Sequence, residues 1–194
     1  RTPIDHFFRS FASKLGDGFA VILTGAGSDG SVGVKAIKEA GGLTFVQDPK
    51  EAEYPSMPRS AIATGCADDV LPLSSLAERI AALIPIKQHI QEGKVLDIQE
   101  DALRAIFAYL KTRTGHDFSR YKRPTVLRRL ARRMQVKQIP ELKDYLEHLQ
   151  RNPEEIQALF GDFLISVTTF FRDPAAFDAL EKLVPRLFEG KNLS

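Results

Sequence analysis

A short apolar run that ends in a glycine-rich turn constrains the fold of this chain more than any other feature. Residues 19–24 are almost unbroken in apolar side chains, which is typical of a parallel strand covered on both faces. The turn at residues 25–30 is followed by a helical pattern over residues 34–40 and a second apolar run at residues 43–46. This order predicts a βαβ unit, and hence an α/β fold with a partly built parallel sheet.

Helical patterns lie on both sides of this unit. Apolar residues recur at helical spacing from Ile4 to Leu15 and stop at residues 16–18, Gly-Asp-Gly, where we expect the first helix to end. Further helices are expected near Pro58, which suits a first helical position, and over residues 75–84. We expect both of these helices to cover the sheet.

The second half of the chain shows helical patterns and no convincing strand, so we expect an all-α region there. Asn152 and Pro153, followed by two glutamates, are typical of a helix N-terminus, because Asn caps, Pro suits the first position and acids favour the first turn. The patterned segments are residues 100–113, 124–136, 141–150, 153–165 and 174–188.

A stretch without periodicity separates the two halves. Residues 85–97 combine Pro, Gly and mixed charges, and the length of 194 residues permits either one large domain or two small ones. We therefore place the first domain at residues 1–85, a linker at residues 86–98 and the helical domain from residue 99 onward.

The composition is that of an ordinary folded protein, with 43% hydrophobic residues, 27 basic and 25 acidic side chains. Cys66 is the only cysteine, so the chain can form neither an internal disulfide nor a thiolate zinc cluster, and we expect no metal and a reducing cytoplasm. No apolar run approaches the ~20 residues that span a bilayer, so we expect no membrane insertion. Because the sequence lacks an initiator Met and ends abruptly at Ser194, we expect it to be a piece of a longer protein.

Asp29 lies in the glycine-rich turn, between a strand and a helix, which is where open α/β sheets place their ligands. The turn has neither the GxGxxG nor the GxxxxGK[ST] spacing, so a nucleotide-binding interpretation is weak. The alternative is a purely structural role, in which Asp29 caps the following helix, because Asp is among the preferred cap residues.

The residues around Asp29 form an ordered set of short motifs. They are Ile4-Asp5, Phe7-Phe8, Ser10, Ala12, Val21-Ile22-Leu23-Thr24-Gly25, Gly27-Ser28-Asp29-Gly30, Gly41-Gly42, Gln47-Asp48, Met57-Pro58, Ala61-Ile62 and Val70-Leu71-Pro72-Leu73. Over roughly residues 3–84 this set resembles the C-terminal half of the chemotaxis protein-glutamate methylesterase, the CheB catalytic domain. The resemblance implies that Asp29 is the acid of a Ser-His-Asp triad, whose serine and histidine the family places upstream. None of the four histidines here sits in the matching motif, and Ala26 stands where the family commonly has Met, beside the oxyanion pocket.

Basic residues gather on one expected helix. Residues 119–138 hold eight basic side chains and no acid, and most such runs are the solvated face of an amphipathic helix. Here like charges lie at i,i+4 at a small cost, so we expect four arginines to face solvent, opposite the apolar side, and to be arranged for an acidic partner. Nucleic acid is the weaker candidate, because the net charge is only +2 and no aromatic platform accompanies the arginines. The four are Arg128, Arg129, Arg132 and Arg133.

Further motifs surround these arginines. They are Gly115-His116-Asp117-Phe118-Ser119, Tyr121-Lys122, Tyr145-Leu146 and Asn152-Pro153-Glu154-Glu155. From about residue 99 to 188 the sequence resembles the N-terminal helical domain of the chemoreceptor glutamate methyltransferase, the CheR family. The resemblance implies that the basic helix meets the acidic, glutamate-bearing helix of a chemoreceptor through Arg128, Arg129, Arg132 and Arg133.

Residues 164–174, Leu-Ile-Ser-Val-Thr-Thr-Phe-Phe-Arg-Asp-Pro, form the strongest single motif of the second half. If the motif has only a structural role, its threonines would follow the end of a helix, its phenylalanines would pack in a core and Asp173 would cap the next helix. That interpretation gives no role to Arg172, whose guanidinium presents fixed hydrogen-bond donors that suit a carboxylate. In the resembled family the segment lines the S-adenosylmethionine pocket, which implies Ser166, Thr168 and Arg172 as contacts to that cofactor. Ser166 stands where the family often has Asn.

Together the two resemblances imply a fusion protein of sensory adaptation. It would hydrolyse methyl esters of chemoreceptor glutamates and methylate these glutamates from S-adenosylmethionine. We expect the helical domain to end at residue 168, residues 169–194 to begin a methyltransferase domain, and the 194-residue chain by itself to be inactive. The alternative is a noncatalytic scaffold that docks on acidic helices.

Overall fold

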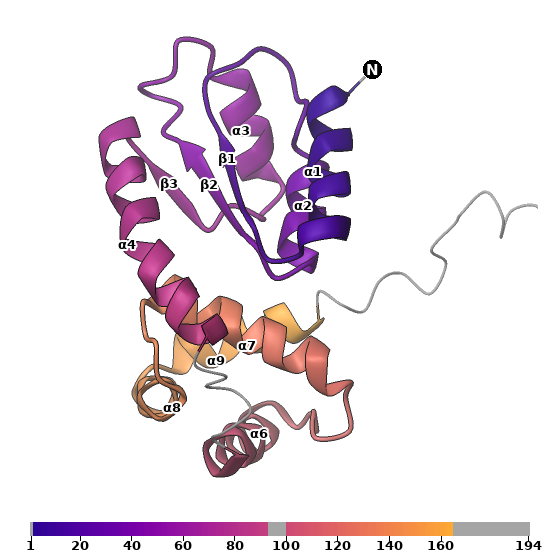
Figure 1. The fold of residues 1–194 in the computed structure, drawn as a ribbon, viewed down its shortest axis with the longest axis vertical. Helices are drawn as coiled ribbons and strands as arrows, with labels where there is room; N and C mark the ends of the chain where they lie inside the picture. The colour runs from indigo at the N-terminus through magenta and orange to yellow at the C-terminus, as the bar shows by residue number, and fades with distance from the viewer. Residues whose placement is uncertain (1, 93–99, 165–194) are drawn as a thin grey trace, which may run out of the picture. The chain divides into compact units, whose positions relative to one another are not determined.

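The computed structural model describes residues 2–92 and 100–164, and the described residues up to Phe163 form one compact unit. An α/β region comes first, with α1 (Pro3–Leu15), β1 (Phe19–Ile22), α2 (Gly33–Glu39), β2 (Leu43–Gln47), α3 (Ser56–Ala63), β3 (Asp69–Leu71) and α4 (Leu73–Glu92). A helical region follows, with α6 (Glu100–Thr114), α7 (Arg123–Lys137), α8 (Leu142–Arg151) and α9 (Pro153–Leu164) (Figure 1). The expected α/β fold followed by an all-α region is therefore confirmed.

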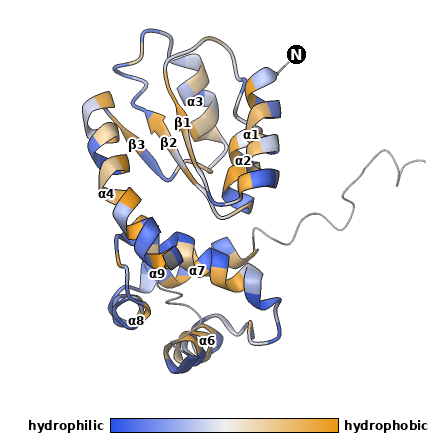
Figure 2. Cartoon of the chain, viewed as in Figure 1, coloured by the Kyte–Doolittle hydropathy of each residue, from blue (hydrophilic) through white to orange (hydrophobic). Residues whose placement is uncertain are grey.

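The three strands form a parallel sheet in the order β1-β2-β3. Helices α1, α2 and α3 cover one face of this sheet and α4 covers the other (Figure 1). Every residue of the central strand β2 is buried. A strand covered on both faces needs apolar side chains on both, which explains the hydrophobic colour of β1 and of much of β2 in Figure 2.

Hydrophobic side chains fill both faces of the sheet and the centre of the helical region. Ile37 and Val46 belong to the core on the face of α1 to α3, and Phe45 packs on the opposite face with Leu83. Each fully buried side chain of this size stabilises the fold by about 1.5–3 kcal/mol relative to exposure. The helical region has its own core, which contains Leu130, Tyr145, Leu149 and Leu159.

Gly42 marks a close approach between the start of β2 and the residue before β1. A Cβ atom at this position would lie 2.2 Å from the carbonyl oxygen of Gly18 and 2.8 Å from Cγ2 of Ile37. The same carbonyl of Gly18 accepts a hydrogen bond from the N–H of Leu43 at 3.1 Å. Only glycine leaves room for this approach, so Gly42 fixes how α2 ends against the sheet.

The helix bounds agree with the expected segments to within about two residues for α6 to α9, and the start of α9 at Pro153 is confirmed. Two features differ. The helix expected over residues 75–84 is longer, because α4 continues through Pro85 to Glu92, so part of the expected linker is helical. The strand β3 was not expected, because three residues that begin with Asp69 form no apolar run. The expected helix at residues 174–188 lies outside the described residues.

Candidate active-site turn and arginine network

The glycine-rich turn lies at the carboxyl end of β1 and is held by neighbouring segments. Ser56 Oγ accepts a hydrogen bond from the N–H of Gly27 at 2.9 Å and donates to the carbonyl oxygen of Gly25 at 3.2 Å. Gln47 Oε1, at the end of β2, accepts the N–H of Thr24 at 2.8 Å. The turn is therefore fixed from α3 on one side and from the central strand on the other.

Asp29 binds the N-terminus of α1. Its two carboxylate oxygens accept the N–H groups of Ile4 and Asp5, each at 3.0 Å. The alternative that Asp29 caps the following helix is therefore wrong, since the carboxylate caps the helix that precedes it. Desolvation raises the pKa of Asp29, but the amide hydrogen bonds outweigh this effect and leave the pKa below its ordinary value. The half-buried carboxylate is thus held ionised at neutral pH.

Asp5 makes the arrangement reciprocal. Its buried carboxylate accepts the N–H of Gly33, the first residue of α2, at 2.6 Å. Asp29, which precedes α2, thus binds N-terminal amides of α1, and Asp5 of α1 binds an N-terminal amide of α2. Asp5 was not expected as a site residue. Its signal is an acid in the first turn of a helix, which is too common to indicate a site.

The arginines of α7 are placed differently from the expectation. Arg128 is exposed, but the side chains of the other three are buried, so the prediction that they face solvent is wrong for these three. The relative exposure is 1% for Arg129, 0% for Arg132 and 9% for Arg133. The physical reason is that α7 lies between two surfaces, with Leu130 in the helical core and Val136 against the core of the α/β region.

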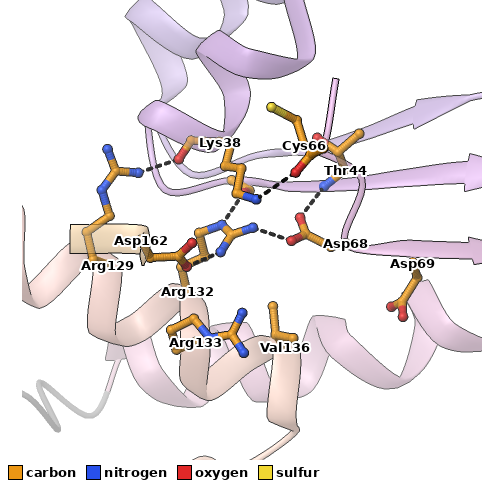
Figure 3. Close-up of polar contacts among 12 residues, drawn as sticks. Lys38, Thr44, Cys66, Asp68, Asp69, Arg129, Arg132, Arg133, Val136 and Asp162 are labelled. Carbon is orange, nitrogen blue, oxygen red and sulfur yellow. Dashed lines mark hydrogen bonds and ion pairs between the residues drawn. The ribbon is translucent and has the colours of Figure 1, made fainter. Parts of the chain in front are cut away.

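Arg132 is the centre of a polar network between the two regions (Figure 3). Its guanidinium forms ion pairs with Asp68, which precedes β3, and with Asp162 of α9, and both carboxylates are almost completely buried. Its Nε donates to the carbonyl oxygen of Gly42 at 3.1 Å. The second oxygen of Asp68 accepts the N–H of Thr44 at 2.8 Å. One arginine therefore joins α7 to α9 and to the sheet.

Arg129 adds a second contact to the α/β region. Its Nη1 donates to the carbonyl oxygen of Lys38 in the last turn of α2 (Figure 3). Burial and the neighbouring charge of Arg128 lower the pKa of Arg129 to about 10, so the guanidinium remains charged at neutral pH. A cation suits this position, because the carbonyl end of a helix carries partial negative charge.

Arg133 belongs to the interior of the helical region. It forms two hydrogen bonds with Glu155 of α9, at 2.8 and 2.6 Å, and the same carboxylate accepts the hydroxyl of Tyr145 at 2.7 Å and an ion pair from Lys137 at 3.2 Å. Burial raises the pKa of Glu155, but the bonds from Arg133 and Tyr145 outweigh it and leave the pKa below its ordinary value. This network fixes α7 against α9.

The acidic partners of these arginines were missed because they are distant in sequence. Asp162 and Glu155 share the buried face of α9 with Ile156, Leu159 and Phe163. Acids at the spacing of an apolar face are the one signal that could have revealed them, since a buried carboxylate needs a cation. Glu155 was expected only as a favourable charge in the first helical turn.

Several expected features concern residues or groups outside this network. Ser166, Thr168 and Arg172, the expected contacts to S-adenosylmethionine, lie outside the described residues. His6 is exposed on α1. Among residues 2–92 and 100–164 there is no group of three metal-ligating side chains. None of the helices described for this chain is long and apolar enough to cross a bilayer.

Two family models match the chain in succession. Residues 1–80 match the CheB methylesterase family, and residues 101–164 match the all-alpha domain of the CheR methyltransferase family. The first match contains the glycine-rich turn with Asp29, and the second contains α7 with its arginines.

Individual relatives support the same division. The chain is similar to an "Uncharacterized 104.1 kDa protein" from Rhodobacter capsulatus, with 38% identity over 95% of this chain and 22% of that protein. It is similar to a protein-glutamate methylesterase/protein-glutamine glutaminase from Halobacterium salinarum, with 48% identity over 42% of this chain and 24% of that protein. A protein of the same name from Bordetella parapertussis is 42% identical over 46% of this chain and 26% of its own length.

The chain spans only about a quarter of the length of these relatives. The Rhodobacter relative matches both regions in one polypeptide, whereas the two methylesterases match less than half of the chain. The chain therefore joins part of a CheB-type methylesterase domain to the all-α domain of a CheR-type methyltransferase.

Proposed function

We propose that the chain is part of a sensory-adaptation protein that both removes and adds methyl groups on chemoreceptor glutamates. The methylesterase-type region would contribute to hydrolysis of glutamate methyl esters. The CheR-type region would contribute to methylation from S-adenosylmethionine. The two family matches in one chain, in this order, support a protein that serves both directions of one modification.

The observation that carries the esterase part of this proposal is the state of Asp29. We assign Asp29 as the acid of a Ser-His-Asp triad. It lies beyond the carboxyl end of β1, where parallel sheets bind ligands, and the amides of Ile4 and Asp5 keep it ionised. A triad acid must remain a carboxylate, because it orients the imidazole and stabilises the imidazolium.

The chemistry follows from these roles. The serine hydroxyl attacks the ester carbonyl while the histidine takes its proton and then passes it to the departing methanol. Water hydrolyses the acyl-enzyme in a second step with the same base. Asp29 supports both steps without bond formation, and each carboxylate oxygen has a second lone pair that can accept an imidazole N–H in addition to the amide bonds.

For the methyltransferase part, we assign Ser166, Thr168 and Arg172 to the S-adenosylmethionine pocket. The match to the CheR all-alpha domain supports this cofactor class for the parent protein. We further propose that α7 recognises an acidic receptor helix through its arginines. The excess of basic side chains on this helix supports that role.

The proposal predicts methanol release that depends on upstream residues. The 194-residue chain should release no methanol from a methylated receptor peptide above the level of its own Asp29→Ala variant. A longer chain that includes the family's upstream serine and histidine should release it, and Asp29→Asn should lower kcat by about 10⁴-fold. Asp48→Asn is the matched control, because its side chain only bonds the nearby N–H of Lys50.

The outcomes separate the proposal from its alternative. Methanol release by the extended chain at an unchanged rate in Asp29→Asn would remove Asp29 from the triad. An extended chain that hydrolyses no ester but binds acidic helical peptides would instead support the noncatalytic scaffold.

A further inference from the structure

The arginine face of α7 meets the amino end of the sheet. Gly42 and Asp68 lie directly before β2 and β3, so the two groups of the α/β region that Arg132 contacts lie at one edge of the parallel sheet. The carbonyl of Lys38, which Arg129 contacts, comes from the end of α2 next to this edge. Arg129 and Arg132 are here called the docking pair, and each donates hydrogen bonds to acceptor oxygens of the α/β region.

The chemistry presented to the docking pair resembles that of an acidic helix. The α/β region offers one carboxylate, from Asp68, and two backbone carbonyl oxygens, from Lys38 and Gly42. A helix with a row of glutamates offers the same kind of acceptors to the same guanidinium groups. Two guanidinium groups buried against one set of acceptors cannot at the same time bind a second set.

We propose that the docking pair is a shared surface, which the α/β region occupies in this structure and which an acidic α-helix binds only after that region has moved away. This inference rests on the proposed recognition of acidic receptor helices. It adds that the esterase-type region competes for the same arginines. Binding of the acidic helix and closure of the two regions are then mutually exclusive.

The contact between the regions is of a kind that can open. A buried ion pair loses hydration on both sides, and this penalty offsets most of the attraction. Burial raises the pKa of Asp68 above its ordinary value, and the charge of Arg132 and the Thr44 amide compensate only in part. When the regions separate, Arg132 keeps its ion pair with Asp162 inside the helical region. Arg132 is therefore oriented before a helix binds.

Arg133 takes no part in the exchange. Its partner Glu155 lies on α9, within the same helical region, and Tyr145 donates to the Glu155 oxygen that also accepts Arg133 Nε. Separation of the regions leaves this network intact. Of the three buried arginines, Arg129 and Arg132 thus change partners and Arg133 does not.

The test uses the whole 194-residue chain and an Ala/Glu-rich α-helical peptide as the probe. Asp68→Asn weakens the contact from the α/β side without altering α7, and the Asn oxygen can still accept the Thr44 amide. Because the apparent affinity scales with the fraction of open chains, we expect Asp68→Asn to bind the peptide about tenfold more tightly than the wild type. Asp48→Asn, with the same change of charge, should bind like the wild type.

A distance measurement gives an independent readout. Spin labels at Arg9→Cys on α1 and Lys143→Cys on α8, both exposed positions, report the separation of the two regions in a Cys66→Ser background. We expect one narrow distance distribution for the otherwise unaltered chain. The peptide, or Asp68→Asn, should shift this distribution to longer distances.

The outcomes distinguish this inference from the proposed function. Equal affinities for the wild type and Asp68→Asn, with an unchanged distance distribution on binding, would overturn the shared surface while leaving acidic-helix recognition in place. Absence of peptide binding in both chains would overturn the recognition itself, and the shared surface with it.

Discussion

Two aspartates at opposite edges of one sheet show how differently the same residue type can be used. Asp29 follows β1 at the carboxyl edge, is half-buried and is bound by the amides of α1. Asp68 precedes β3 at the amino edge, has a side chain that is only 6% exposed and forms an ion pair with Arg132. Amide hydrogen bonds leave the pKa of Asp29 lowered, whereas desolvation leaves that of Asp68 raised.

We propose that the two edges serve different functions. The carboxyl edge holds an ionised, partly accessible group, which is what a reaction with an imidazole requires. The amino edge holds a group whose charge is neutralised within the protein, which is what a contact between regions requires. The helical region therefore packs at the edge that is remote from the glycine-rich turn.

The largest expected effect comes from removing the cation at the amino edge. Arg132→Gln leaves the carboxylates of Asp68 and Asp162 buried without their counter-ion. We expect the free energy of unfolding, measured by urea denaturation, to fall by about 3–5 kcal/mol. Arg128→Gln on the exposed side of the same helix is the control. A loss below about 1 kcal/mol, the range of surface ion pairs, would mean that the network is solvated.

Removing one of the two carboxylates should cost less. In Asp68→Asn the guanidinium of Arg132 retains Asp162, and the Thr44 amide retains an acceptor. We expect a loss of about 1–3 kcal/mol in the free energy of unfolding, because one charged hydrogen bond is weakened. Asp48→Asn serves as the control, and an equal loss in both variants would remove Asp68 from its assigned role.

The two edges should also differ in their response to pH. The lowered pKa of Asp29 means that this group stabilises the folded chain above its unfolded pKa, and that the stabilisation is lost as pH falls through the folded pKa. The raised pKa of Asp68 has the opposite sign, so its favourable contribution is present below the unfolded pKa and is lost as pH rises through the folded pKa. Carboxyl ¹³C NMR titration should show Asp29 below and Asp68 above the ordinary aspartate value. The reverse order would contradict the comparison.

The smallest effect is expected for the exposed arginine. Arg128→Ala should change the free energy of unfolding by no more than about 0.5 kcal/mol, as for most surface substitutions. Binding of the acidic helical peptide should nevertheless weaken, because Arg128 lies on the same helix as the docking pair. A large loss of stability would place Arg128 with the buried arginines.

Sequence patterns located the elements well where the pattern depends on local chemistry. The apolar runs predicted β1 and β2, and helical spacing predicted α6 to α9, because burial on a regular element imposes a period. The position of Asp29 at the end of β1 followed from the order of strand, turn and helix. Its partners did not, since a carboxylate in a turn can cap either neighbouring helix, and only the fold brings α1 to it.

The arginines of α7 show the limit of the same reasoning. A run of like charges predicts a solvated face as long as no acid is near in sequence. Asp68 lies 64 residues from Arg132, and Asp162 lies 30 residues from it. Such long-range pairs arise only when the helical region packs on the sheet. The charge pattern of α7 therefore predicted a solvated face for an external acidic partner, and it gave no sign of the carboxylates within the chain.

The central claim is that the Arg132 network joins the helical region to the amino edge of the sheet. A double-mutant cycle with Asp68→Asn, Arg132→Gln and the combined variant tests it most directly. The cycle isolates the coupling of the two side chains in the free energy of unfolding. We expect a coupling energy of at least about 1 kcal/mol, as for residues in one ion-pair network. Effects that add to within about 0.3 kcal/mol would show that the two side chains do not interact and would contradict the account.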